Sequence, residues 1–497
     1  MQHSARRTAL AATATGGVAV AVSLIGSGTP SLWGDEAASV LSAERSVPSL
    51  IDMVQHVDAV HGLYYLGLHV WILLAGSSPF AVRAPSAVAV GLCVAGIVVL
   101  GSLLRGRRFG VFAGLLCAAL PRLTDVGSEA RSYAFSAAIA TWLTVVLALI
   151  LRSPGPRMRL WVAYGALLAI GTWLFLYLAL VAVAHLAVLL LPPGRGRLVR
   201  SWSIAVASGL VAASPLVLLA IAERGQVAYL ASRNYLDPTS LFVSPFFENP
   251  VVAGLGWLLI VSGGAVSIRD WRTAWHRWQV PTPSSVSALV PLTWLVVPGS
   301  VLIASSFAIA DYTPRYLAIC APAAGLLMAV PLDALATRPR RWWLSVAGLL
   351  AVILVTAPTW MLQRGPYAKN QSDWAAISAQ LSIHAHPGDA VAFDDSVRPS
   401  RKPRLALDTY PAGFRGMLDP TLKTPFTASP TWYDEVYSLA DAMRRGRLDG
   451  VSTVWLVEYA TPAHTDNYGI STLRAAGFRE RARVRTHRSV ILEFARG

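Results

Sequence analysis

Residues 1–360 contain about eleven stretches of mostly apolar residues, and most of them approach the roughly 20 residues that an α-helix needs to cross a bilayer. The whole chain of 497 residues is 54% hydrophobic and only 14% charged, whereas a soluble domain carries about 25% charged residues. Both features predict an α-helical polytopic membrane protein. The predicted spans are 9–28, 82–104, 109–124, 133–151, 159–173, 175–192, 201–221, 251–268, 286–308, 316–336 and 342–360.

Clusters of arginine precede the first of these stretches and follow every second one. Because short cytoplasmic loops are enriched in Lys and Arg, the clusters predict a cytoplasmic N-terminus and an odd number of spans. The formal net charge of +15 is then explained by topology signals, and we expect no nucleic-acid partner. The clusters are Arg6 and Arg7; Arg105, Arg107 and Arg108; Arg152, Arg157 and Arg159; Arg195, Arg197 and Arg200; Arg269, Arg272 and Arg277; and Arg338, Arg340 and Arg341.

The first apolar stretch has two interpretations. Arg6 and Arg7, followed by the apolar residues 9–28, resemble a secretory signal peptide. However, the stretch is nearly long enough to span, and polar residues that could carry out chemistry follow it directly. We therefore expect a transmembrane helix that is retained in the protein.

The loop 29–81 is expected to face outward and to contain helices that lie on the membrane surface, within 35–76. Residues 36–57 have the periodicity of an amphipathic helix, and the aromatic-rich run 63–74 is too short to span. A true span at 62–76 is the alternative. It would move the later arginine clusters to the outer side, so we reject it.

The chain is expected to form two domains, a transmembrane domain at 1–360 and a small extracytoplasmic domain at 361–497. Charged residues, proline and glycine become more frequent in the second part, and no run of apolar residues is long enough to span. The pattern predicts an α/β domain. Its predicted helices are 374–383 and 471–476, and its predicted strands are 390–393, 454–457 and 490–494.

Two adjacent carboxylates, Asp35 and Glu36, follow the first apolar stretch closely. Adjacent helical residues point about 100° apart, so one carboxylate could accept a proton from a hydroxyl group while the other binds a metal or an arginine. The alternative is a helix cap, in which Asp35 accepts backbone N–H bonds and Glu36 favours the helix dipole.

A second polar group is His56, Asp58 and His61. Their spacing does not place the three side chains on one face of a helix, but a bend could bring Asp58 and His61 together on a cation. The alternative is that they are solvated residues at the end of a surface helix.

Arginines at the outer ends of predicted spans are candidates for binding phosphate, because the planar guanidinium group can bind two phosphate oxygens. Arg131, with Glu129 nearby, and Arg315 are such candidates. The alternatives are a local ion pair at Glu129 and Arg131, and an interfacial Arg315 that extends toward water. The loop 222–250, rich in Tyr, Phe, Pro and Asn, is a candidate lid, and His185 is interpreted as a helix-packing residue.

Five short motifs occur in an order that resembles the C-type glycosyltransferases, which use polyprenyl-phosphate sugars. The resemblance covers most of residues 30–330 and is strongest to bacterial proteins related to protein O-mannosyltransferases and the lipid A aminoarabinose transferase. Where relatives usually have His-Pro-Pro-Leu-Tyr-Tyr, this chain is shorter by one residue and lacks the prolines. The motifs are Trp33-Gly-Asp-Glu-Ala, His61-Gly-Leu-Tyr-Tyr with Leu68-His-Val-Trp71, Arg83-Ala-Pro-Ser86, Ser128-Glu-Ala-Arg-Ser-Tyr133 and Pro314-Arg-Tyr316.

The resemblance implies a C-type glycosyltransferase fold and roles for particular residues. Asp35, with Glu36 beside it, corresponds to the acidic residue of the first outer loop, which is the proposed catalytic base or acceptor-orienting group. Glu129 and Arg131 are implied near the donor phosphate. Further substrate-binding candidates are Arg315, His61 and Tyr64. Some relatives bind a divalent cation and others none, so the cofactor is left open, with Asp58 and His61 as weak metal candidates.

The implied function is transfer of a monosaccharide, such as mannose or another hexose, from a polyprenyl-phosphate donor. The acceptor would be a lipoglycan, polysaccharide or protein at the outer face of the plasma membrane. A transporter or flippase for lipid-linked glycans is the main alternative, although transporters usually place ionisable groups near the midplane. An inactive envelope scaffold is a third interpretation.

Overall fold

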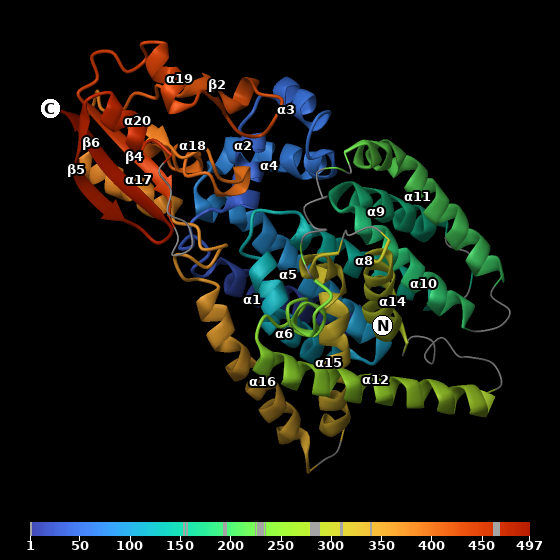
Figure 1. Ribbon diagram of the computed structural model, residues 1–497. Coiled ribbons are helices and arrows are strands. Elements are labelled where there is room, and N and C mark those ends of the chain that lie inside the picture. Colours follow the sequence, from blue (N-terminus) through green and yellow to red (C-terminus); the bar gives the residue numbers. More distant parts are fainter. Residues whose placement is uncertain are drawn as a thin grey trace. The chain divides into compact units, whose positions relative to one another are not determined.

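The computed structural model in Figure 1 describes residues 2–152, 158–191, 196–223, 235–278, 289–308, 312–337, 340–460 and 468–497, and the single positions 155, 225 and 233. The chain forms two compact units. One, the helical unit, comprises Met1–Ile25, Ala59–Leu63 and Arg83–Met361. The other, the mixed unit, comprises Gly26–Asp58, Tyr64–Val82 and Leu362–Gly497.

The predicted class, an α-helical polytopic membrane protein, is confirmed. In the described part of the chain, seven helices are long and apolar enough to cross a membrane. The other four predicted spans are shorter helices: α6 (Arg107–Ala119), α9 (Met158–Leu174), α10 (Ala179–Leu190) and α14 (Val290–Ser305). The seven longer ones are α1 (Gln2–Leu24), α5 (Pro79–Leu104), α8 (Tyr133–Arg152), α11 (Gly196–Ala222), α12 (Pro250–Trp278), α15 (Ala321–Ala336) with the preceding η5 (Pro314–Cys320), and α16 (Trp342–Leu362).

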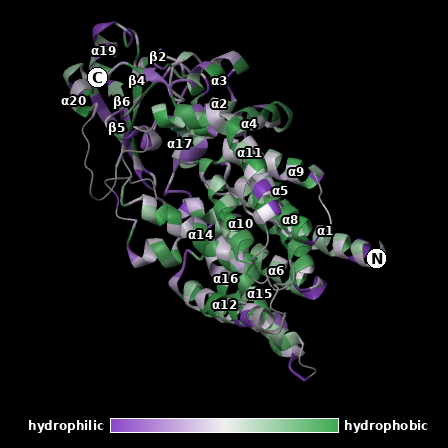
Figure 2. Ribbon diagram, turned by 90° about the vertical axis from the view of Figure 1, so that its right-hand side faces the viewer, coloured by the Kyte–Doolittle hydropathy of each residue, from purple (hydrophilic) through white to green (hydrophobic). Residues whose placement is uncertain are grey.

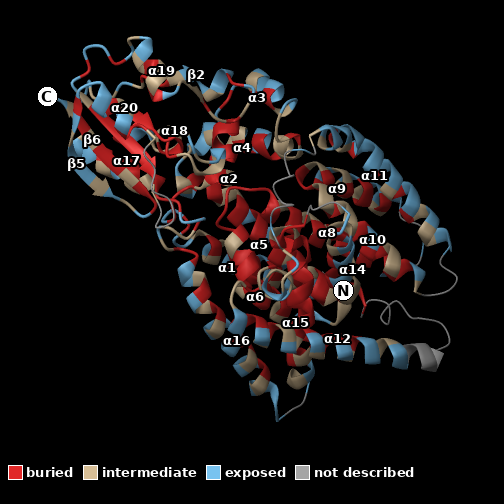
Figure 3. Cartoon of the chain, in the orientation of Figure 1, coloured by how far each residue is buried: buried red, intermediate tan, exposed pale blue. Residues whose placement is uncertain are grey.

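These helices differ in how deeply the protein buries them. The most apolar windows of α8 and of η5–α15 are 78% and 83% buried, whereas those of α11 and α16 are 22% and 28% buried. Figure 3 shows this contrast, and Figure 2 shows that the exposed helices are nevertheless largely hydrophobic. Val211, Leu218 and Leu354 are examples of large apolar side chains left exposed. Such surfaces are favourable in contact with lipid.

A buried polar network joins four helices of the helical unit. His185 on α10 contacts Thr144 on α8 through Nε2 at 3.1 Å and the hydroxyl of Tyr164 on α9 through Nδ1 at 2.8 Å. Trp202 on α11 donates to the same hydroxyl at 3.2 Å. The structure therefore agrees with the interpretation of His185 as a helix-packing residue.

Two arginines of the second basic cluster form ion pairs with distant acids. Arg105 lies 2.9 Å from Asp270, and Arg108 lies 2.8 Å from Asp333. The remaining clusters are only partly described. Arg157, Arg195 and Arg338 lie outside the described residues, as does the side chain of Arg277.

The mixed unit contains a four-stranded sheet in the order β1-β4-β6-β5 (Figure 1). β1 (Ala390–Phe393) and β4 (Thr453–Tyr459) are parallel, and β6 (Ser489–Arg496) is antiparallel to both β4 and β5 (Phe478–Arg485). The prediction missed β5, whose frequent charged residues hide its strand pattern and suit a sheet edge. The helices α17 (Trp374–His384), α18 (Leu405–Thr409), α19 (Leu439–Arg444) and α20 (Ile470–Ala475) and the pair β2 (Leu422–Thr424) and β3 (Glu435–Val436) complete the C-terminal part.

The predicted amphipathic helix at 36–57 is in fact two helices, α2 (Gly34–Ala43) and α3 (Val47–Val54). The break occurs because Ser46 caps α3 by accepting a hydrogen bond from the backbone N–H of Ser49, and proline stands near the start of α3. The run 63–74 forms α4 (Gly62–Ala75) after the short η1 (Ala59–His61).

Candidate functional site

Four of the five predicted substrate-binding residues, His61, Glu129, Arg131 and Arg315, meet in the helical unit. The turn that contains Glu129 and Arg131 connects α7 (Pro121–Val126) to α8. Arg131 Nη2 lies 3.1 Å from His61 Nε2, and the backbone N–H of Arg131 donates to the carbonyl of Glu129. Because this turn is short and buried, both of its charged side chains are fixed close to the start of α8.

The contact with Arg131 defines the protonation state of His61. An arginine can only donate hydrogen bonds, so Nε2 of His61 must accept and the ring proton must be on Nδ1. The pKa of His61 is well below its ordinary value, first because of burial and then because of the positive charges of Arg131 and Arg315. The ring is therefore neutral at physiological pH and does not add to the local charge.

Glu129 pairs with a residue far along the chain. Its Oε1 lies 3.7 Å from Nη1 of Arg315, which belongs to η5. The carboxylate is 3% exposed and the guanidinium group is 29% exposed. A buried carboxylate thus orients a cation that keeps partial access to solvent. This arrangement can hold a guanidinium group ready for a phosphate.

Aromatic rings pack around Arg315 and Tyr316 near the start of η5. The ring of Tyr133 lies under the guanidinium group of Arg315 at 5.9 Å, a cation–π distance. Tyr316 stacks on Tyr177 at 5.0 Å and meets Phe175 edge-to-face at 5.4 Å. Phe175 and Tyr177 were not predicted as site residues. Both lie at the start of the predicted span 175–192, where aromatic residues give no distinctive signal.

Arg122 is a third residue that the sequence did not reveal. It forms ion pairs with Asp125 at 3.1 Å and with Glu248 at 3.3 Å, and its Nε donates to the carbonyl of Pro245. This buried arginine therefore connects α7 to the segment before α12. Residues 224, 226–232 and 234 of the predicted lid loop lie outside the described residues, so the lid interpretation stays a prediction.

In the mixed unit, Asp35 and Glu36 occupy the first turn of α2. The cap position is Trp33, which makes no side-chain cap hydrogen bond, so the interpretation of Asp35 as the helix cap is wrong. Both charges remain well placed to interact with the helix dipole. Glu36 is fully buried, whereas Asp35 is partly exposed. Of the two, Asp35 is therefore the one that can meet a substrate.

Close packing against Ser400 explains why residue 34, directly before Asp35, is glycine. A Cβ atom on Gly34 would lie 2.4 Å from Cβ and 2.6 Å from the carbonyl oxygen of Ser400. Ser400 belongs to η6 (Pro399–Arg401), which follows β1. Any side chain at residue 34 would collide with this backbone, so the motif requires glycine here.

The other predicted residues of the first loop have local partners. Asp58 accepts a hydrogen bond from the hydroxyl of Tyr65 at 3.1 Å, and His56 Nδ1 lies 2.8 Å from the carbonyl of Asp52. Tyr64 is 4% exposed and contacts the ring of Tyr65 edge-to-face. Asp58 belongs to the mixed unit and His61 to the helical unit.

No cation site emerges from the residues that the structure describes. Among them there is no group of three or more His, Cys, Asp or Glu side chains that could hold a metal ion. The weak candidates Asp58 and His61 are not part of such a group, and a divalent cation stays an untested implication of the resemblance.

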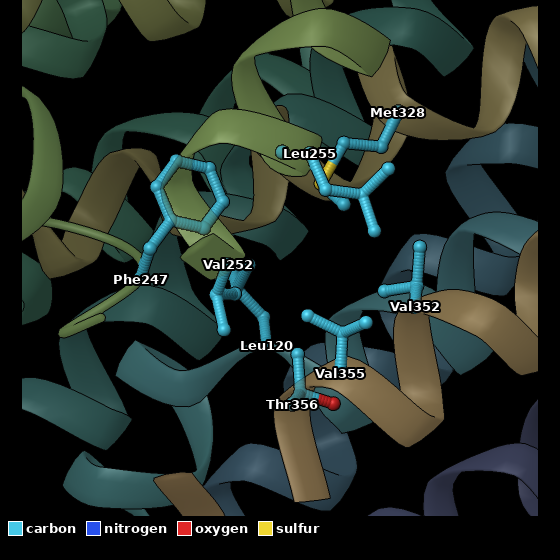
Figure 4. Close-up of a pocket in the computed structure, with 9 residues that line it drawn as sticks. Leu120, Phe247, Val252, Leu255, Met328, Val352, Val355 and Thr356 are labelled. Carbon is cyan, nitrogen blue, oxygen red and sulfur yellow. The ribbon is translucent and has the colours of Figure 1, made fainter. Parts of the chain in front are cut away.

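A separate pocket in the helical unit is almost wholly apolar. It lies among α12, α15 and α16 (Figure 4). Thr356 supplies its only polar side chain, and no ionisable residue lines it, so the pocket cannot carry out acid–base chemistry. It is lined by Leu120, Phe247, Val252, Leu255, Gly256, Met328, Val352, Val355 and Thr356.

Comparison with known proteins supports both the fold and a sequence relationship. Residues 63–219 match the family of dolichyl-phosphate-mannose-protein mannosyltransferases. This region includes Glu129 and Arg131 but begins after Asp35 and ends before Arg315. The comparison with curated proteins finds no match.

Among solved structures, ArnT from Cupriavidus metallidurans is similar over 96% of both chains. With undecaprenyl phosphate bound it gives a TM-score of 0.57 at 15% identity, and in the apo state a TM-score of 0.56 at 15% identity. At this identity the likeness establishes the fold. The chain is therefore a multi-pass membrane protein with the fold of ArnT, a fold of the C-type glycosyltransferases, and its residues 63–219 are similar to the dolichyl-phosphate-mannose-protein mannosyltransferases.

Proposed function

We propose that this protein transfers a monosaccharide from a polyprenyl-phosphate donor to a hydroxyl group of a cell-envelope acceptor. The observation that carries the proposal is the arrangement of Arg131 and Arg315 around buried Glu129 and neutral His61. The match to mannosyltransferases and the fold shared with a protein that binds undecaprenyl phosphate support it. We further propose that the sugar is a hexose, most simply mannose.

The donor phosphate would bind at the two arginines. Transfer leaves the phosphate with an additional negative charge, and prearranged guanidinium groups stabilise charge at the place where it develops. Glu129 holds Arg315 in position, and the neutral ring of His61 holds Arg131 without adding a positive charge.

Asp35 would act as the general base. The acceptor oxygen forms a bond to the anomeric carbon of the sugar while the bond from that carbon to the phosphate oxygen breaks. The leaving polyprenyl phosphate keeps the electron pair, and Asp35 takes the proton of the acceptor hydroxyl. Attack from the side opposite the leaving group inverts the anomeric configuration. Asp35 is proposed for this role on the motif resemblance and on its partial exposure in α2.

We propose that the reaction occurs at the outer face of the plasma membrane. The alternating arginine clusters support this orientation, with the N-terminus cytoplasmic and residues 361–497 outside. A lipoglycan, polysaccharide or protein is the proposed class of acceptor. Cysteines introduced singly at Arg340 and Arg415 of the full chain would test the orientation, because only the second should react with a membrane-impermeant maleimide in intact cells.

The central experiment measures transfer of radiolabelled mannose from a synthetic polyprenyl-phosphate mannose in membranes that contain the full chain. Asp35→Asn should reduce transfer at least a hundredfold at equal protein level, because the amide cannot accept the proton. Asp52→Asn is the matched control, since Asp52 is an exposed carboxylate on α3 of the same unit. If Asp35→Asn keeps full activity, Asp35 is not the base.

A second measurement separates transfer from transport. Proteoliposomes with the same labelled donor should yield a new glycosidic product and free polyprenyl phosphate. Movement of the labelled lipid between leaflets without any new glycoside would instead support a flippase and reject the transferase proposal.

A further inference from the structure

The residues just before Asp35 are held by the C-terminal part of the mixed unit. The hydroxyl of Ser31 accepts a hydrogen bond from the backbone N–H of Ala375 at 3.2 Å, and the backbone N–H of Leu32 donates to the hydroxyl of Tyr410 at 2.8 Å. The close approach of Gly34 to Ser400 is the third contact. The C-terminal segment therefore determines where the first turn of α2 lies.

The turn that contains Ser400 is itself fixed to the sheet. Buried Asp394, directly after β1, accepts hydrogen bonds from the backbone N–H groups of Ser396 at 2.8 Å and Tyr459 at 3.3 Å. The carbonyl of Arg398 accepts from the backbone N–H of Arg401 at 2.8 Å and closes η6. Because β1 and β4 are parallel, this turn stands at their carboxyl ends, the edge where α/β sheets usually bind ligands.

The turn and its continuation carry four basic side chains, of which two are neutralised. Lys402 forms an ion pair with Asp395, and Arg404 pairs with Asp419 and Asp434. The other two, Arg398 and Arg401, form no ion pair with an acid in the described part of the chain.

Arg401 instead donates to the neutral hydroxyl of Tyr459 at 3.3 Å. Burial lowers the pKa of Arg488, and the nearby positive charge of Arg401 lowers it further, while Asp373 forms an ion pair with Arg488. Arg398 is exposed. The turn therefore presents uncompensated positive charge one residue from Ser400, which contacts the glycine before Asp35.

We propose that the turn 396–402 binds an anionic group of the acceptor, a phosphate or a carboxylate, through Arg398 and Arg401. This binding would place the acceptor hydroxyl beside Asp35, and it rests on the proposed function. Arginine suits both anions because its planar group makes two parallel hydrogen bonds. Arg398 and Arg401 then determine acceptor specificity and take no part in binding the donor.

The test uses the full chain in nanodiscs and a labelled lipid and glycan extract from the envelope of a deletion strain. The extract is used untreated, dephosphorylated with hydrofluoric acid, or reduced at its carboxylates. Binding of the untreated extract should fall about tenfold or more in Arg398→Gln/Arg401→Gln, as expected for lost charge-assisted hydrogen bonds. The treatment that removes the recognised anion should lower wild-type binding to the level of the variant.

The matched control is Arg415→Gln, an exposed arginine of the same unit. It should bind the extract as the wild type does. In the transfer assay, the double variant should raise KM for the acceptor and leave both kcat and KM for the donor nearly unchanged.

The inference would be overturned if wild type and double variant bind the untreated extract equally. It would also be overturned if the double variant still binds less than wild type with each of the two treated extracts. The binding measurement needs no turnover. If the protein shows no transfer activity but still binds the extract through Arg398 and Arg401, the anion site stands and only the proposed function is rejected.

Discussion

Nη2 of Arg131 donates a hydrogen bond to Nε2 of His61 across 3.1 Å, although the two residues are 70 positions apart in the chain. The geometry requires an unprotonated Nε2, and the lowered pKa of His61 provides it. A protonated ring would face two guanidinium groups. Protonation of this ring at low pH therefore opposes the fold of the helical unit.

Acid should destabilise the protein through His61. In the unfolded chain His61 takes up a proton below pH about 6.5, whereas the folded protein takes it up only at lower pH. The stabilising contribution is thus fully present above the unfolded pKa and is lost as pH falls from there toward the folded pKa. Thermal unfolding in detergent at pH 7.5 and 5.5 should show a larger drop in Tm for wild type than for His61→Gln.

Glutamine is chosen because its carbonyl oxygen can still accept from Arg131 but does not titrate in this range. His3→Gln, in the N-terminal turn of α1, serves as the control and should keep the wild-type pH dependence. Parallel pH profiles for wild type and His61→Gln would contradict the assignment.

The pair of Glu129 and Arg315 should be sensitive to the shape of the cation. Arg315→Lys keeps the charge but loses the planar group that reaches Glu129 and covers the ring of Tyr133. We expect kcat/KM for the donor to fall about tenfold to a hundredfold, the equivalent of one or two charge-assisted hydrogen bonds. Steady-state transfer kinetics provide the measurement.

Arg269→Lys is the matched control, because this side chain on α12 is 74% exposed. Its kinetics should be unchanged. Wild-type kcat/KM in Arg315→Lys would show that positive charge alone is enough at this position.

Gly34→Ala should destabilise the mixed unit and lower activity. The new methyl group would overlap backbone atoms of Ser400, which a side-chain rotation cannot relieve. Overpacking of this kind costs about 1–3 kcal/mol. Gly67→Ala on α4 is the control, since a Cβ at Gly67 would meet no atom within 4 Å. Thermal unfolding and transfer activity should distinguish the two variants, and an unchanged Gly34→Ala protein would contradict the close contact.

Arg45 should hold the segment 426–431 in place. Its Nη2 donates to the carbonyls of Phe426, Ser429 and Thr431, and its side chain is almost fully buried. In Arg45→Met these carbonyls lose their donor, at a cost of about 1–3 kcal/mol for each group that stays buried and unsatisfied. Hydrogen exchange should show increased exchange in residues 426–431 with little change in β4. Unchanged protection there would mean that Arg45 does not support the segment.

The sequence predicted the helices well because a membrane span is a local pattern of about 20 apolar residues. It predicted β1, β4 and β6 for a similar reason, since each contains a run of apolar residues. It missed β5, because charged residues interrupt that pattern. It also joined α2 and α3 into one helix, because the periodicity of residues 36–57 continues across the cap at Ser46.

The candidate site was predicted only as a set of residues. Glu129 and Arg131 could be selected because ionisable groups at a membrane edge are costly unless they have partners. Arg315 could be selected as a phosphate-binding arginine, and His61 through the motif resemblance. Their pairing could not be predicted. Glu129 and Arg131 are two residues apart, yet the structure joins Glu129 to Arg315 and Arg131 to His61. Phe175 and Tyr177 were missed because an aromatic residue at the start of an apolar stretch has no distinctive sequence signal.

The sequence by itself determined the class of the protein, the positions of its apolar segments and the short motifs that carry its charged residues. Those are properties of neighbouring residues, so they can be predicted without information about tertiary contacts. Only the tertiary structure decided that Gly34 must be glycine because Ser400 lies against it, and that His61 is neutral because it is buried and lies near two arginines. Such contacts depend on chain segments that come together only after folding.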